Sequence, residues 1–193
     1  MYMTSISYIF EEMKLTHKPN TFWLEFGVFT GNSINYISNF TTDTVYGFDS
    51  FEGLPEDWRP EYKQGAFNVN GIMPDVNYNV KLIKGLFNET LPVFIADNPK
   101  KISFVHVDCD LYSSTKCIFD NIGPYFDDDC IILFDEIFNY PGHEEHELKA
   151  LNEFVDSTEW TYKILYSHGE TAVVRLSKWR GSKKVQGGCG HGG

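Results

Sequence analysis

The sequence predicts an α/β fold built on a doubly wound, mainly parallel sheet. Short apolar runs typical of strands alternate five times with segments typical of helices. The strand-type runs, such as 102–108 and 130–135, are continuously apolar. Strands buried on both faces of a parallel sheet have this character. The chain then ends in two adjacent strand patterns with no helix between them, which indicates an antiparallel addition to the sheet.

The elements follow one another in a regular order. The expected strands span 21–27, 44–49, 80–85, 102–108 and 130–135, and the expected helices span 4–15, 32–40, 88–98, 113–126 and 143–157. Asn32 or Ser33 is the expected cap of the second helix. We expect the third helix to break near Pro92, because proline lacks the N–H of a helical bond. Residues 126–130, "FDDDC", are interpreted as a solvated turn before the fifth strand, and the long polar segment 50–79 as a functional or mobile loop.

The two terminal strand patterns narrow the fold class. Residues 160–167 and 171–177 are joined by 168–170, "HGE", and are expected to form a hairpin. Dinucleotide-binding dehydrogenases usually continue with further βα units, whereas class I methyltransferases end with an antiparallel pair. The predicted fold is therefore a Rossmann-like domain of the class I methyltransferase type over 1–177. The basic and glycine-rich segment 178–193 is interpreted as a flexible tail.

Composition excludes several classes of function. The chain has 193 residues and a formal net charge of -11, which disfavours binding to a nucleic-acid backbone. No apolar segment approaches the ~20 residues of a membrane span, and the N-terminus is a poor signal peptide. The cysteines lack CxxC spacing, which favours reduced thiols and a cytoplasmic location. They are Cys109, Cys117, Cys130 and Cys189.

The turn after the first strand, "LEFGVFTGNS", has the pattern ExGxxxG. The dinucleotide fingerprint GxGxxG is absent. Glycines let a cofactor approach the backbone, and an acid before them repels a pyrophosphate but suits an ammonium. S-adenosylmethionine (SAM) has an ammonium and no phosphate, although an ordinary βα turn with chance glycines is the alternative. The candidate cofactor-binding residues here are Glu25, Phe26, Gly27, Thr30, Gly31 and Ser33.

The next two strand ends extend the candidate cofactor site. Asp49 ends the second strand and is placed to accept ribose hydroxyls, with Ser50 beside it. Such an acid does not distinguish NAD from SAM, and a turn-initiating Asp is the alternative. After the third strand, Gly85 and Phe87 are candidates for the adenine, since Phe87 offers a stacking face.

Acids gather at the ends of the fourth and fifth strands. Asp108 and Asp110 follow the fourth strand, and Asp135 and Glu136 follow the fifth. These strands are neighbours in a doubly wound sheet, and crowded carboxylates repel unless protonated or neutralised by a cation. Oxygen ligands favour Mg²⁺ or Ca²⁺ over zinc. Asp110 is either a ligand or the cap of the helix that starts near Ser113.

Five stretches together resemble one family. They are, in order, "LEFGVFTGNS", "VYGFDSFEGLPEDW", "KGLFNETLP", "HVDCDLYSSTK" and "ILFDEIFNYPG". They resemble the macrocin O-methyltransferases, class I SAM-dependent enzymes that methylate sugar hydroxyls of macrolide antibiotics. The resemblance covers roughly residues 21–157. The aromatic residue Phe29, in the turn after the first strand, is a further point of resemblance to this family.

The resemblance implies a Mg²⁺-dependent O-methyltransferase whose metal is held by Asp108, Asp135 and Glu136. Asp108 also borders the SAM site, and either Asp108 or His143 would take the proton of the acceptor. The family commonly has two aspartates where this chain has Asp-Glu. The antibiotic-tailoring members have a longer N-terminal extension, so the expected acceptor is more broadly a sugar or a sugar-containing small molecule.

Loops 50–79 and 137–146 are expected to close over the cleft. The aromatic residues expected to stack on the acceptor are Trp58, Tyr62, Phe67 and Tyr140. Three alternatives stay open: an NAD-type oxidoreductase, a non-catalytic SAM-binding module, and an O-methyltransferase with a non-sugar acceptor. No nucleic acid or membrane partner is expected, and a homo-oligomer is left open.

Overall fold

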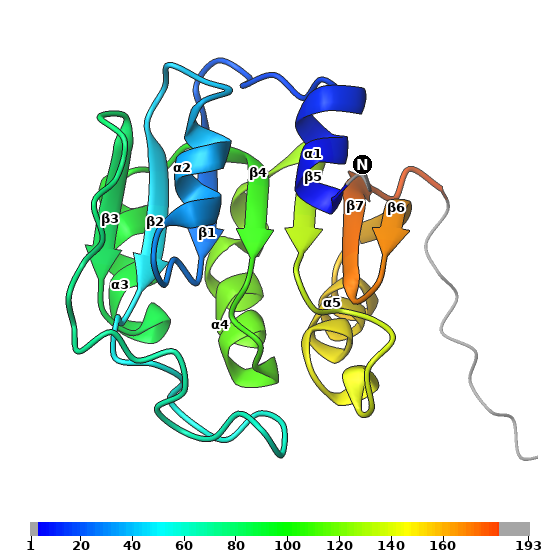
Figure 1. Cartoon of the computed structure of the whole chain (residues 1–193). Coiled ribbons are helices and arrows are strands. Elements are labelled where there is room, and N and C mark those ends of the chain that lie inside the picture. Colours follow the sequence, from blue (N-terminus) through cyan, green and yellow to red (C-terminus); the bar gives the residue numbers. More distant parts are fainter. Residues whose placement is uncertain (1–3, 182–193) are drawn as a thin grey trace, which may run out of the picture.

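The computed structural model describes residues 4–181 and is built on a seven-stranded sheet of order β3-β2-β1-β4-β5-β7-β6 (Figure 1). The strands are β1 Thr21–Phe26, β2 Val45–Asp49, β3 Val80–Lys84, β4 Lys101–Val107, β5 Phe126–Phe134, β6 Trp160–His168 and β7 Thr171–Lys178. Strands β1 to β5 pair in parallel, and β7 is antiparallel to both β5 and β6. The predicted parallel sheet with a terminal hairpin is confirmed.

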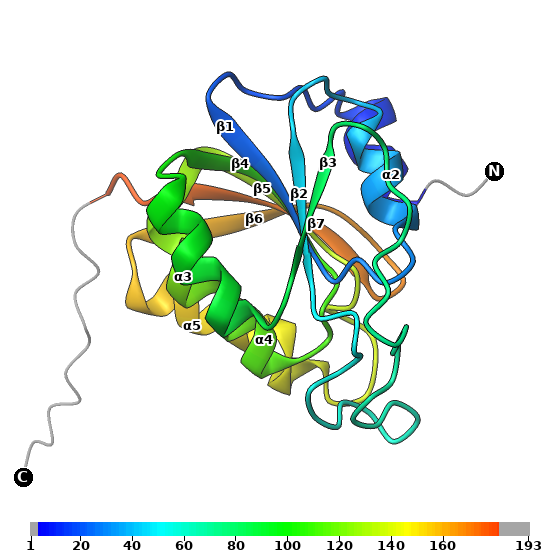
Figure 2. The same ribbon diagram turned by 90° about the vertical axis from the view of Figure 1, so that its left-hand side faces the viewer.

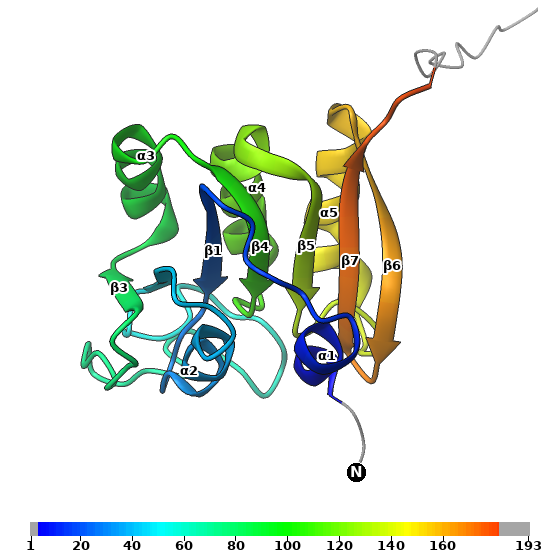
Figure 3. The ribbon, with the colours of Figure 1, turned by 90° about the horizontal axis from the view of Figure 1, so that it is seen from above.

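Helices cover both faces of the sheet. On one face lie α1 Ser5–Ser7, the π-helical turn η1 Tyr8–Glu12 and α2 Asn32–Ser38; on the other lie α3 Phe87–Asp97, α4 Tyr112–Ile122 and α5 Glu147–Ser157 (Figures 2 and 3). Short 3₁₀ turns, η2 Gly123–Tyr125 and η3 His143–Glu145, flank the strand β5 and the helix α5. The three layers correspond to a doubly wound fold.

Apolar side chains fill both interfaces between the sheet and the helices. In β1, Trp23 and Leu24 are fully buried on opposite sides of the strand, Trp23 toward the layer of α2 and Leu24 toward the layer of α3 to α5. Burial of one such side chain is worth about 1.5–3 kcal/mol. Each central strand therefore contributes to two cores at once, which explains why its sequence shows no polar alternation.

Two details of the helices differ from the sequence prediction. The N-cap of α2 is Gly31, with φ of 82°, so the prediction of Asn32 or Ser33 as cap is wrong. Pro92 lies inside α3, which runs unbroken through it. Neighbouring Leu91 is fully buried against the sheet, and this packing outweighs the single helical bond that proline removes.

The start of β5 also differs. Residues 126–130 belong to the strand and do not form a separate turn. A register shift between β4 and β5, with Asp129 at φ of 68°, accommodates the extra residues as a bulge. The acids are paired: Lys18 Nζ lies 2.6 Å from Asp127 Oδ2, and Arg180 contacts Asp128 at 2.5 Å. Tertiary ion pairs allow these acids to lie in a strand.

The carboxyl ends of the parallel strands converge on one edge of the sheet. Hydrogen bonds between neighbouring strands continue beyond the strand ends, from Asp108 N–H to Phe26 O and from Asp135 N–H to Val107 O. The segment 50–79 lies beyond the same edge (Figure 1). This edge therefore gathers the residues that the sequence selected as functional.

Three sequence expectations concern the rest of the chain. Most of the predicted tail, 182–193 with Cys189, lies outside the described residues, and residues 178–181 are described. The three described cysteines carry free thiols. No helix within residues 4–181 is long and apolar enough to cross a membrane.

Candidate active site

A cavity of about 440 Å³ opens at the carboxyl ends of the strands. The turns that follow β1, β2, β3, β4 and β5 all contribute to its wall. Of the residues assigned to the cofactor, the cation or catalysis from the sequence, those lining it are Gly27, Asp49, Ser50, Gly85, Phe87, Asp108, Asp135 and Glu136. The volume is in the range typical of small-molecule sites.

Gly27 forms the closest approach between two strand ends. Its φ is +88°, and a Cβ built there would lie 1.7 Å from the carbonyl oxygen of Asp108. Its N–H donates to Phe48 O at 3.0 Å. Only glycine combines this positive φ with so close a contact to the backbone of Asp108, so the two strand ends can pack together at the cavity wall.

Asp49 organises the turn after β1. Its Oδ2 accepts hydrogen bonds at 2.8 Å from the N–H groups of Val28 and Phe29. Its Oδ1 accepts another from Phe51 N–H at 2.7 Å. Phe29 and Phe51 have φ of 48° and 58°, in the left-handed region, so the carboxylate stabilises strained backbone at the cavity wall. A carboxylate accepts about four hydrogen bonds, so capacity for a ligand hydroxyl remains.

Six of the candidate cofactor-binding and catalytic residues do not line the cavity. They are Glu25, Phe26, Thr30, Gly31, Ser33 and His143. Glu25 is fully buried: its Oε1 accepts from Ser33 Oγ at 3.0 Å and its Oε2 lies 2.9 Å from His106 Nδ1. His143 Nδ1 lies 2.9 Å from Tyr140 O. Glu25 therefore links the β1–α2 turn to β4 and does not face the cavity.

His106, inside β4, carries a buried charge behind the site. Burial by itself lowers its pKa, but the hydrogen bond with Glu25 and the charge of that carboxylate outweigh burial and raise it to about 9. The imidazole is therefore protonated at neutral pH. Its charge opposes the effect of burial on Asp108, two residues further along β4.

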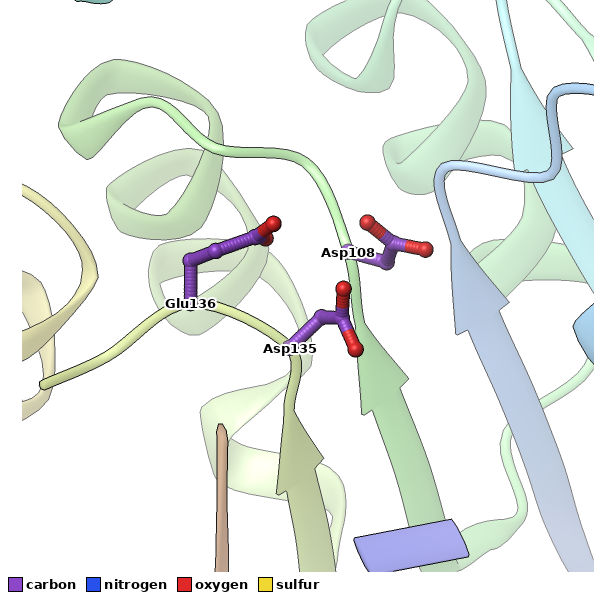
Figure 4. Close-up of side chains that lie close together, drawn as sticks. All are labelled: Asp108, Asp135 and Glu136. Carbon is purple, nitrogen blue, oxygen red and sulfur yellow. The ribbon is translucent and has the colours of Figure 1, made fainter. Parts of the chain in front are cut away.

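Asp108, Asp135 and Glu136 come together as expected. One ligand oxygen from each lies within 4.8 Å of the others, and Figure 4 shows Asp135 and Glu136 extending from the end of β5 toward Asp108. Within residues 4–181, no side chain donates a hydrogen bond to Asp108 or Asp135, and Glu136 Oε2 is buried without a partner. An oxygen-only, underpartnered group of this kind fits a hard divalent cation.

The electrostatics of this group also favour a cation. Burial raises the pKa of Asp108 to about 7, and the charges of Asp135 and Asp110 add to the shift. Burial and the same neighbouring acids raise the pKa of Glu136 to about 9. A bound cation would stabilise the ionised carboxylates and reverse these shifts.

Asp110 is not a helix cap. The N-cap of α4 is Leu111, which makes no side-chain capping bond, so the cap interpretation of Asp110 is wrong. Asp110 has φ of 66° and lines the cavity. Burial raises its pKa to about 7, with Arg59 opposing and Asp135 reinforcing the shift. It lies outside the group of three potential ligands.

Sequence reasoning missed other residues of the site. The first turns of α4 line the cavity through Ser113, Ser114 and Cys117, and the i+4 and i+3 spacing of Cys117 from the two serines was a usable signal. Glu147 is fully buried with no hydrogen-bond partner for either carboxylate oxygen among the described residues. Burial and the charge of Glu136 raise its pKa well above the ordinary value.

The predicted aromatic residues divide into two groups. Phe67 lines the cavity, stacks on Tyr62 at 5.2 Å and meets Phe29 edge-on at 5.8 Å between ring centroids. Trp58 and Tyr140 are buried and do not line the cavity. Phe67 is therefore available to an acceptor, whereas Tyr62, Trp58 and Tyr140 lie outside the cavity wall.

A parallel sheet closed by an antiparallel hairpin, with a cavity at its carboxyl edge, defines the class I methyltransferase fold. Residues 24–137, more than half of the chain, match the family model described as "Methyltransferase domain". The chain belongs to this family and is a methyltransferase.

Solved structures share the fold. The calicheamicin methyltransferase CalS11 is 24% identical with a TM-score of 0.66, over 89% of this chain and 77% of CalS11. The O-methyltransferase NovP is 17% identical with a TM-score of 0.64, over 90% of this chain and 77% of NovP. An O-methyltransferase from Bacillus cereus, solved with SAH, is 14% identical with a TM-score of 0.52, over 81% of this chain and 73% of that one. No curated protein sequence matches significantly.

Proposed function

We propose that the chain is a SAM-dependent and Mg²⁺-dependent O-methyltransferase acting on a hydroxyl of a sugar or sugar-containing small molecule. The observation that carries the proposal is the group of Asp108, Asp135 and Glu136 in the wall of the cavity that also contains the Gly27 turn. Among the similar structures, another structure of CalS11 describes a TDP-rhamnose 3'-O-methyltransferase, 22% identical to this chain, which supports a sugar hydroxyl as the acceptor class.

The cofactor side of the cavity is assigned to the turns after β1, β2 and β3. The turn at Gly27, which lines the cavity, would accept the methionine part, and Asp49 the ribose hydroxyls. Phe87 and the exposed Leu86 would flank the adenine. Bound SAM supplies an electrophilic methyl group on a sulfonium.

The acceptor side is assigned to the acids after β4 and β5. Asp108, Asp135 and Glu136 would hold the cation, which when bound lowers the pKa of an acceptor hydroxyl and orients it. Asp108 would receive the hydroxyl proton while the O–CH₃ bond forms and the S–CH₃ bond breaks, which leaves a neutral thioether. His143 does not line the cavity, so Asp108 is better placed as the base. Positioning supplies most of the acceleration.

The exposed rings of Phe67 and Phe29 would stack on the apolar face of the acceptor. Such rings suit a sugar, and they equally suit a planar diol. A non-sugar diol is therefore the second candidate acceptor.

The test is a screen of sugars, glycosylated metabolites and catechol-type diols with methyl-labelled SAM, with Mg²⁺ or with EDTA. We expect labelled product only with Mg²⁺, and SAM binding by calorimetry under both conditions. Turnover that survives EDTA would remove the cation from the proposal. Binding of NAD without binding of SAM would overturn the cofactor assignment, and SAM binding without any turnover would favour a non-catalytic module.

A further inference from the structure

Arg59, in the long loop 50–79, joins three segments that are distant in sequence. Its guanidinium carbon lies 3.8 Å from the ring centroid of Trp58 and 3.9 Å from that of Tyr140. Its Nη2 donates to Glu170 Oε2 at 2.7 Å. Tyr140 belongs to the segment after β5, and Glu170 to the β6–β7 turn, so one side chain contacts both loops and the hairpin.

Glu170 also holds the segment after β5 through its backbone. Its carbonyl oxygen accepts hydrogen bonds from the N–H groups of Ile137 and Phe138, at 2.9 and 3.0 Å. Next to it, Gly169 O accepts from Asn139 Nδ2 at 2.6 Å. The hairpin turn is thus the common anchor of both loops.

This anchor is directly connected to the acidic group. Glu136 precedes Ile137 in the chain, and the Tyr140 hydroxyl donates to Glu136 O at 3.4 Å. The backbone that carries Glu136 is therefore held by the same residues that Arg59 contacts.

The environment of Arg59 makes its contacts stronger than an ordinary surface pair. The side chains of Arg59 and Glu170 are 16% and 38% exposed, whereas Lys63 and Asp57 form an ion pair in the same loop at 62% and 60% exposure. Desolvated cation–π contacts and shielded ion pairs are stronger than exposed ones. The Lys63–Asp57 pair is consequently a matched control for charge lost from this loop.

We propose that Arg59 and Glu170 form a latch that positions Glu136 and holds loop 50–79 and the segment 137–140 together over the acceptor side of the cavity. Both are positioning residues, because neither lines the cavity. The part of this inference that concerns the cation rests on the proposed function, whereas the closure of the two loops does not.

The experiment compares the wild-type chain with Glu170→Gln, Arg59→Met, the double variant and the control Lys63→Met. Amide hydrogen exchange followed by mass spectrometry is measured on peptides covering 50–66 and 136–142, without cofactor or cation. Calorimetry with MgCl₂ and, separately, with SAM gives the two affinities. Where an acceptor is available, kcat and KM are measured over a range of Mg²⁺ concentrations.

We expect exchange about tenfold faster in both peptides for either single variant, since tertiary contacts of this kind set local opening. We expect the Mg²⁺ dissociation constant to rise about three- to tenfold, in line with the effect of residues that orient metal ligands. The SAM affinity of every variant should match that of wild type. The control Lys63→Met should also show wild-type exchange and wild-type Mg²⁺ affinity. The double variant should resemble the single ones, because the two residues act as one unit.

The outcomes separate the two proposals. If wild type binds no Mg²⁺ but exchange still increases in both peptides, the proposed cation site is wrong and the loop latch holds. If wild type binds Mg²⁺ and the variants show unchanged exchange and unchanged Mg²⁺ affinity, the latch is wrong. Faster exchange confined to residues 50–66 would show that Arg59 does not reach the segment carrying Glu136, and would also overturn it.

Discussion

Asp49 ends one parallel strand and Asp135 follows another, and both line the cavity, yet their surroundings are opposite. Asp49 accepts three backbone N–H groups, whereas no side chain within residues 4–181 donates a hydrogen bond to Asp135, which lies among other acids. Hydrogen bonds from the protein stabilise the negative charge of Asp49, whereas the charge of Asp135 is left without a stabilising side-chain donor among the described residues. The proposed cofactor side is therefore preorganised by hydrogen bonds, whereas the proposed acceptor side fits completion by a cation.

The largest effect on activity is expected at Asp135. Asp135→Asn should lower methyl transfer at least ~100-fold, because it removes a proposed cation ligand and its charge. It should leave SAM affinity unchanged and raise the melting temperature of the cation-free protein, since it relieves repulsion with the neighbouring acids. Turnover assays, calorimetry and thermal unfolding measure the three quantities. Retained turnover with unchanged Mg²⁺ dependence would show that the cation lies elsewhere.

The next largest effect concerns the backbone between the two sides. Gly27→Ala should destabilise the fold by about 3 kcal/mol or more, because the new Cβ would meet a carbonyl oxygen. Gly65→Ala is the matched control: its φ is +84° but nothing lies within 4 Å, so only the strain of about 1 kcal/mol remains. Denaturant unfolding measures both. Equal losses would mean that the contact with Asp108 is not rigid.

A smaller effect is expected at Asp49, and its sign on stability is opposite to that of Asp135→Asn. Asp49→Asn should lower the free energy of unfolding by about 1–2 kcal/mol, because both carboxylate oxygens accept backbone N–H groups and the amide keeps only one acceptor oxygen. It should also weaken SAM binding about tenfold through the loss of a proposed hydroxyl partner. Asp43→Asn, an exposed acid outside the cavity, serves as the control. If Asp49→Asn stabilises the protein as Asp135→Asn does, the hydrogen bonds to Asp49 do not stabilise the fold, and the proposed difference between Asp49 and Asp135 is wrong.

The last expected effect is a dependence of the stability of the folded protein on pH. Asp108 and Glu136, with pKa values raised to about 7 and 9, keep protons in the folded state that the unfolded chain releases near pH 4. Stability of the cation-free protein should therefore fall as pH rises from about 5 to 9. His106, with its pKa raised to about 9, adds stability below its ordinary pKa that is lost over the upper part of this range.

Magnesium should counteract this loss, because it competes with protons for the same carboxylates. We expect saturating Mg²⁺ to raise the melting temperature by several °C at about pH 8.5 and by less at about pH 6. Thermal scans of wild type and Asp135→Asn, with Mg²⁺ or EDTA, measure the difference. An effect of Mg²⁺ that is equal at both pH values, or that persists in Asp135→Asn, would point to binding outside the acidic group.

Much of the fold and part of the site could be predicted from the sequence. Apolar runs and turn residues are local signals, so the strand order along the chain, the terminal hairpin and the acids at the ends of β4 and β5 were all recognisable. The strand start at Phe126 was not, since acids in a strand are tolerated only where distant cations such as Lys18 pair with them. Gly31 as the cap of α2 was also missed, because its left-handed backbone arises from the turn as a whole.

The sequence by itself determined which residues end the parallel strands, because that follows from local patterns. Tertiary structure alone decided where their side chains point. Glu25 lies opposite His106 in the pairing of β1 with β4, so a carboxylate that suited a ligand ammonium instead forms a buried pair with the neighbouring strand. Arg59 and Glu170 meet across 111 positions of sequence. Such pairings depend on how strands and loops pack in space, and no local periodicity encodes them.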